Sequence, residues 1–156
     1  MAHTPINHPL RGFYRFLSAL AGLYILVFGV VAFTKTKGEP LFSQTHTAWA
    51  LGLRSNLAFA IVSIVAGAVI LVAALLGRNI DHFVFLWGGG VFMVMGIVML
   101  LLLESDSNFL AFSMSNCIVS FIIGSILVTA GLYTKSGTAE AAEAEEQFRH
   151  AQVVRG

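Results

Sequence analysis

Few residues in this chain could take part in catalysis or bind a cofactor, and the histidines are the first candidates. Two imidazoles that face each other inside a helical bundle can hold a haem between them. All the histidines fall outside the four long apolar segments of the chain, so the sequence predicts no haem within a membrane. They are His3, His8, His46, His82 and His150.

His82 directly follows Asp81, and a histidine beside a carboxylate can ligate a cation. Charged neighbours at the start of a helix more often face water, and we expect this pair to do so. The chain also lacks G-x-S-x-G, a phosphate-binding loop and H-E-x-x-H. The sequence therefore predicts no catalytic residue, no metal ligand and no cofactor, and a protein that is not an enzyme.

A third group of polar side chains lies near the start of the last apolar segment. Asn116 follows Ser113 and Ser115 and precedes Ser120. Amide and hydroxyl groups in a low-dielectric setting need partners, so we expect them to bond across the bundle or to carbonyls of their own helix. A small polar pocket formed by Asn116 and Ser113 and opening outward is the functional alternative.

The elements that must position these residues are four segments without Asp, Glu, Lys, Arg or His: residues 16–34, 55–77, 83–103 and 107–134. A helix needs roughly 20 residues to cross about 30 Å of hydrocarbon, and each segment has about that length or more. They predict an all-α fold, a four-transmembrane-helix bundle. Proton relays and most ion pathways are disfavoured, because they need ionisable groups inside the bilayer.

The composition leaves little material outside these segments. Of the 156 residues, 57% are hydrophobic and 11% are charged, which excludes a separate soluble domain. We expect an N-terminal arm at residues 1–15, a transmembrane domain at 16–134 and an Ala/Glu-rich tail at 135–156. The net charge of +1, without a run of Lys or Arg, argues against nucleic acid as a partner. Cys117, the only cysteine, is expected to be a buried apolar residue.

The distribution of positive charge predicts the orientation of the chain in the membrane. Six Lys or Arg residues lie on the side that holds both tails, and three lie on the opposite side. We therefore expect a multi-pass protein of the plasma membrane with both termini in the cytoplasm, and a first span that is a retained helix rather than a signal peptide. The larger set is Arg11, Arg15, Arg78, Lys135, Arg149 and Arg155, and the smaller is Lys35, Lys37 and Arg54.

Small residues recur within the predicted spans. In lipid there is little hydrophobic drive between helices, so small residues that let two backbones approach supply the packing contacts. These positions predict helix packing inside the bundle, and the alternative is a face that docks a helix of another protein. They are Ser18, Gly22, Ser63, Gly67, Gly88, Gly89, Gly96, Ser120 and Gly124.

The chain also resembles itself. Ile61-Val62-Ser63 with Gly67 matches Ile118-Val119-Ser120 with Gly124 at the same spacing, and Ser18 with Gly22 matches Ser63 with Gly67. Either two duplicated helical hairpins or chance within a small apolar alphabet explains this similarity. Duplication would place the two hairpins in parallel orientation.

Several short stretches together resemble an actinobacterial four-helix integral membrane family, known as domain of unknown function 4383. The resemblance covers nearly the whole chain and implies a location in an actinobacterial plasma membrane. It supplies no catalytic residues. The stretches are Asn7-His8-Pro9-Leu10-Arg11 with Tyr14-Arg15, Trp49-Ala50-Leu51-Gly52-Leu53, Gly77-Arg78-Asn79-Ile80-Asp81-His82 and the closing Ala/Glu tail.

Two functional hypotheses follow. The first is a non-catalytic accessory subunit of a larger membrane protein complex, with a respiratory-chain assembly as host, because the spans carry small-residue faces and no reactive groups. The alternative is a lipid or small-molecule binding or transport module acting as a homo-oligomer. The alternative requires a cavity between the helices, bordered by Asn116 and Ser120.

Overall fold

The computed structural model describes residues 5–144 and Gln147. Its long elements are four helices, each long and apolar enough to cross a membrane. The predicted all-α bundle of four transmembrane helices is therefore confirmed. The helices are α1 (Arg11–Thr36), α2 (Leu57–Leu76), α3 (Ile80–Leu101) and α4 (Met114–Tyr133).

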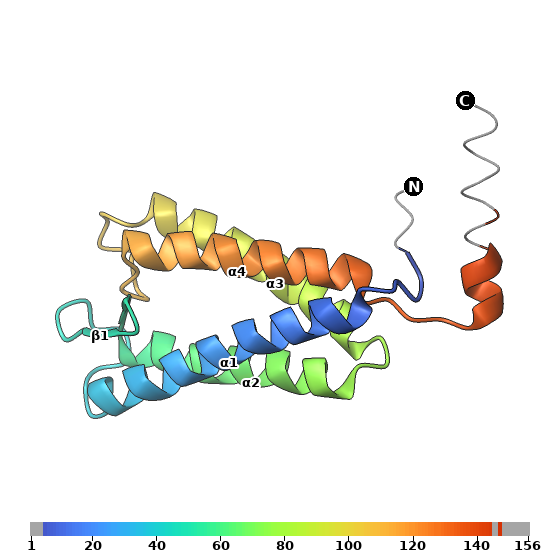
Figure 1. Ribbon diagram of the computed structural model, residues 1–156. Helices are drawn as coiled ribbons and strands as arrows, with labels where there is room; N and C mark the ends of the chain where they lie inside the picture. The colour runs from blue at the N-terminus through green and yellow to red at the C-terminus, as the bar shows by residue number, and fades with distance from the viewer. Residues whose placement is uncertain (1–4, 145–146, 148–156) are drawn as a thin grey trace.

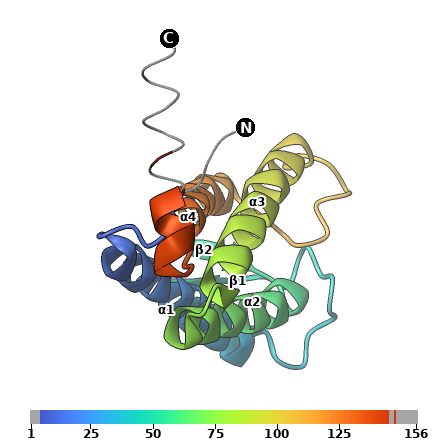
Figure 2. The same cartoon turned by 90° about the vertical axis from the view of Figure 1, so that its right-hand side faces the viewer.

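The bundle has two different ends. Helix α1 begins, α4 ends and α2 connects to α3 at one of them, which we call the termini end (Figure 1). The connections from α1 to α2 and from α3 to α4 lie at the other, which we call the loop end. Seen from the termini end, the helices follow one another round the bundle in chain order (Figure 2).

The helices begin at different residues from those that the charge-free segments predict. Helix α1 begins at Arg11 and α3 at Ile80, so both include ionisable residues in their first turns. Helix α4 begins only at Met114, because the side chain of Asn108 accepts a bond from Phe112 N and donates one to Phe112 O. Such local bonds compete with helical ones. A charge-free segment therefore marks a span but not its ends.

A short β-hairpin lies at the loop end, between the α1–α2 pair and the α3–α4 pair (Figure 1). Strands β1 (Ala48–Ala50) and β2 (Leu53–Ser55) pair antiparallel, with Trp49 opposite Arg54. The two turn residues, Leu51 and Gly52, both have positive φ angles, which suits the twist of a two-residue hairpin. No sequence pattern considered above predicts this element.

The helices form two hairpins, α1 with α2 and α3 with α4, and these pairs make the closest helix contacts in the bundle. Helices α1 and α3 run in the same direction (Figure 1), so the hairpins are parallel. Helices α2 and α4 both have 20 residues, and each residue of α4 lies 57 positions after its counterpart, as Met114 does after Leu57. We call the two helical hairpins the first and second repeat.

The burial pattern follows this correspondence. Ser18, Gly22, Gly29 and Ala32 of α1 are buried, and so are the α3 residues 67 positions later: Phe85, Gly89, Gly96 and Met99. In α2 and α4 the same holds for residues 57 positions apart. They are Ala60, Ser63, Gly67, Ile70, Ala73 and Ala74, with Cys117, Ser120, Gly124, Leu127, Ala130 and Gly131.

Candidate functional site

Within each repeat, glycines let the two helix backbones touch. A Cβ added to Gly67 would lie 2.8 Å from the carbonyl oxygen of Gly22 in α1. In the second repeat, a Cβ on Gly89 would lie 2.8 Å from the carbonyl oxygen of Gly124. Gly22 and Gly89 are counterparts, and so are Gly67 and Gly124. Both repeats are thus closed by the same pair of glycines, which is the close approach that lipid-embedded helices need.

The other small residues predicted to pack are placed less uniformly. Ser18 is fully buried, and Ser63 and Ser120 are nearly so. Gly96 lies against the ring of Phe121, whose Cε1 would be 3.2 Å from an added Cβ. Gly88 differs, because no other part of the described chain lies within 4 Å of its Cβ position. It takes no part in packing inside the described bundle.

The two repeats contact each other less closely than the helices within them, and they leave a cavity of about 130 Å³ between them. All four helices line it, together with Leu53 of β2 and with Leu110 and Phe112 of the segment before α4. The lining is almost wholly apolar: its polar residues are Tyr24, Asn116 and two serines. Cavities of this size are rare in well-packed proteins.

The lining residues come in pairs that the two repeats supply at corresponding positions. Offsets of 67 for α1 with α3, and of 57 for the rest, relate every lining residue except Phe112 to another one. The two repeats therefore contribute equally to the lining, apart from Phe112. The pairs are Tyr24 and Val91, Ile25 and Phe92, Phe28 and Met95, Leu53 and Leu110, Phe59 and Asn116, Val62 and Val119, Ser63 and Ser120, and Ala66 and Ile123.

Asn116 lies at the loop end of the cavity, where both polar atoms of its side chain are hydrogen-bonded. Its Oδ1 accepts bonds from the backbone N of Arg54 at 3.1 Å and from Ser113 Oγ at 2.6 Å, and its Nδ2 donates to the carbonyl of Arg54 at 2.8 Å. These bonds tie α4 to strand β2. Asn116 borders the apolar cavity and Ser113 does not, so the outward-opening polar pocket of Asn116 and Ser113 stays a prediction.

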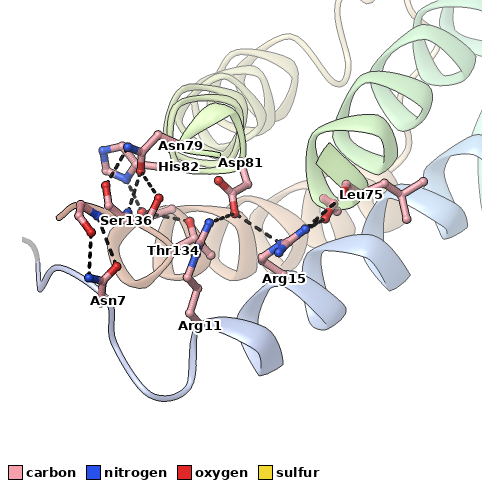
Figure 3. A network of polar contacts seen from close by, with 12 residues as sticks. Asn7, Arg11, Arg15, Leu75, Asn79, Asp81, His82, Thr134 and Ser136 are labelled. Atoms are coloured by element: carbon pink, nitrogen blue, oxygen red, sulfur yellow. Dashed lines mark hydrogen bonds and ion pairs between the residues drawn. The ribbon is translucent and has the colours of Figure 1, made fainter. Parts of the chain in front are cut away.

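An ion-pair network closes the termini end (Figure 3). Asp81 of α3 is fully buried, and its Oδ2 lies 3.4 Å from both Arg11 Nη2 and Arg15 Nε of α1. The expectation that Asp81 and His82 face water is therefore wrong. Both are buried, because α3 begins earlier than its charge-free segment and carries them against α1 and α4. The network joins the first repeat to the second.

Corresponding basic residues also cap the ends of α2 and α4. Arg15 Nη2 donates to the carbonyl of Ala74 at 2.6 Å, and His82 Nδ1 lies 2.6 Å from the carbonyl of Gly131. Since a carbonyl only accepts, His82 carries its proton on Nδ1. His82 is the counterpart of Arg15, and Gly131 of Ala74. The last carbonyls of a helix lack hydrogen-bond partners within that helix. In each repeat, a side chain of the first helix supplies such a partner to the second helix.

The segments on either side of the bundle are attached at the same end. Asn79 Oδ1 accepts a bond from Ser136 N at 2.6 Å, and Asn7 Nδ2 donates to the carbonyl of Gly137 at 2.9 Å (Figure 3). Residues 145–146 and 148–156 of the expected Ala/Glu tail lie outside the described residues. Among the described residues, no three His, Cys, Asp or Glu gather closely enough to hold a metal ion.

Fold and site together define a class: a membrane-spanning four-helix bundle, built from two parallel hairpin repeats around an apolar cavity. Residues 15–133 match the family model described as Domain of unknown function (DUF4383), and the chain belongs to this family. No curated protein and no solved structure matches the chain.

Proposed function

We propose that this protein is a binding module of the membrane, which holds the hydrocarbon chain of a lipid or a small apolar molecule between its two repeats. The observation that carries the proposal is the cavity itself, whose lining is apolar and is supplied in corresponding pairs by the two repeats. Membrane proteins built from parallel repeats commonly bind their ligands where the repeats meet.

The size and chemistry of the cavity favour an apolar occupant over water. An engineered apolar cavity of about 150 Å³ stays dry and binds benzene, and this cavity measures about 130 Å³. A buried water needs two to four polar partners. The most polar lining group, Asn116, already bonds to Arg54 and Ser113. A ring or a short stretch of acyl chain fits these conditions.

We propose a non-catalytic role for this site. The described lining contains no Asp, Glu, Lys, Arg, His or Cys, and the hydroxyl of Tyr24, its only other common acid–base group, donates to the carbonyl of Leu51. Asp81 and His82, the buried ionisable residues of α3, lie outside the lining.

Binding of the fluorescent polyene cis-parinaric acid to the purified protein in detergent tests the proposal. The unaltered protein is expected to give saturable binding, and Ala66→Phe is expected to abolish it, because the new ring occupies the cavity from α2. The matched control is Val65→Phe, one position along, where the side chain is exposed and outside the lining. Equal binding by both variants, or no saturable binding by the unaltered protein, would contradict the proposal.

A second candidate is the accessory subunit of a larger membrane complex, such as a respiratory-chain assembly. The exposure of helix α3 supports this role, since only 22% of its most apolar stretch is buried, against 33–44% in the other helices. Gly88 and Gly90 flank the buried Gly89, and no other part of the described chain lies within 4 Å of either Cβ position, which leaves room for another helix. A stoichiometric partner that copurifies from native membranes and is lost with Gly88→Ile would support this role. A protein that elutes alone in mild detergent counts against it.

We further propose that the protein resides in the plasma membrane of an actinobacterium with its termini end in the cytoplasm. The resemblance noted from the sequence supports the source, and the excess of Lys and Arg at the termini end supports the orientation. Cysteines placed at exposed sites test the orientation in intact cells. A membrane-impermeant maleimide is expected to label Glu104→Cys at the loop end but not Glu140→Cys, and the reverse pattern would overturn it.

A further inference from the structure

The cavity has two sides on which helices of different repeats meet, α2 with α3 and α1 with α4. The relation between the repeats exchanges these sides. Val62 and Val91 line the cavity on the first side, and their counterparts Val119 and Tyr24 line it on the second. In a strictly symmetric molecule, corresponding residues on the two sides would be identical and equally exposed. Differences between Val62 and Val119, and between Val91 and Tyr24, therefore show how the two sides differ.

The two sides do differ. Val62 and Val91 line the cavity and are nonetheless 53% and 59% exposed, so the cavity reaches the outer surface of the bundle between α2 and α3. Val119 and Tyr24 are partly buried on the other side. The hydroxyl of Tyr24 donates to the carbonyl of Leu51 at 3.3 Å, which fixes the ring beneath the β-hairpin. One side is open, and the aromatic ring closes the other.

Buried residues lie toward both ends of the cavity. At the loop end, Asn116 is bonded to strand β2 beside Leu53. Toward the termini end, Phe85 and Leu127 are fully buried in the core, and the ion pairs of Asp81 lie beyond them. The outer surface between α2 and α3 faces hydrocarbon, because both helices are long and apolar enough to span the bilayer.

We infer that the cavity is filled from within the bilayer, through a side opening between α2 and α3 at Val62 and Val91, and that Tyr24 closes the corresponding opening between α1 and α4. This inference rests on the proposed function and specifies its ligand. The ligand is a molecule dissolved in the membrane that inserts a hydrocarbon segment between two helices. The polar part of the ligand stays outside the cavity, because the apolar lining offers it no hydrogen-bond partners.

Stopped-flow measurement of cis-parinaric acid binding tests the side opening. The variant Val62→Phe with Val91→Phe is expected to slow association by about tenfold, because the two rings fill the opening through which the ligand enters. The matched control is Val65→Phe with Val94→Phe, which adds the same rings one helical turn away on the exposed surface, outside the lining. It is expected to bind at the original rates.

A third variant uses the relation between the repeats. The triple variant combines Tyr24→Val with Val62→Phe and Val91→Phe. Tyr24 is the counterpart of Val91, so the change removes the ring that closes the α1–α4 side, and it is expected to restore fast association. Blocked variants that bind at the original rates overturn the side opening while leaving the proposed function intact. Weaker binding without slower association overturns it too, since Val62 and Val91 would then act only as lining. Loss of saturable binding in the unaltered protein removes the proposed function itself.

Discussion

The contacts within each repeat differ from the contacts between the repeats. Within a repeat, Gly22 with Gly67 and Gly89 with Gly124 bring two backbones so close that a methyl group has no room. Between the repeats, side chains of Phe, Val and Ile meet around a cavity, and polar bonds join the two halves at the ends. Where apolar association has little driving force, tight packing arises only where small residues permit it.

The largest effect is expected inside a repeat. Gly67→Ala places a Cβ 2.8 Å from the carbonyl oxygen of Gly22, and overpacking at a backbone contact should lower the free energy of unfolding by about 3 kcal/mol. Titration of helicity with SDS in mixed micelles measures it. The matched control is Gly88→Ala, which adds the same methyl group where nothing lies within 4 Å. If both variants unfold at the same SDS fraction, the repeats are not held by glycine contacts.

A smaller effect is expected for the ion pairs between the repeats. Asp81→Asn removes a fully buried carboxylate that contacts Arg11 and Arg15, whose side chains are 26% and 31% exposed. The loss should be about 2 kcal/mol, less than for a fully buried pair because water still reaches the guanidinium groups. The same titration measures it, with the exposed Asp106→Asn as control. An unchanged midpoint for Asp81→Asn would mean that the termini end is held by other contacts.

The smallest effect is expected for a single cap within the second repeat. His82→Ala removes the bond from Nδ1 to the carbonyl of Gly131 and should lower the free energy of unfolding by about 1 kcal/mol. Hydrogen exchange at the end of α4 locates the change, and the exposed His46→Ala serves as control. Faster exchange spread over the whole bundle, instead of the last turn of α4, would contradict a purely local cap.

Part of the relation between the repeats could be found in the sequence. The match of Ile61, Val62, Ser63 and Gly67 with residues 57 positions later gives the correct correspondence of α2 with α4. The likeness of Ser18 and Gly22 to Ser63 and Gly67 has another basis, since these residues lie on helices that pack against each other. The correspondence of Arg15 with His82 cannot be found by comparing the sequences of the repeats, because the two residues are of different types. It is recognised from the corresponding carbonyls, of Ala74 and Gly131, that the two side chains bond.

The four spans could be predicted from the sequence, because a bilayer imposes a length and an apolar composition that can be counted along the chain. The sequence also predicted Gly22, Gly67, Gly89 and Gly124 as packing residues, but not Gly29 and Gly131, whose contacts are equally close. The burial of Asp81, the bonds of Asn116 to the β-hairpin and the cavity between the repeats became visible only in the three-dimensional arrangement of the chain. Burial and cavities depend on which residues from distant segments meet in space, and neither charge-free length nor residue spacing carries that information.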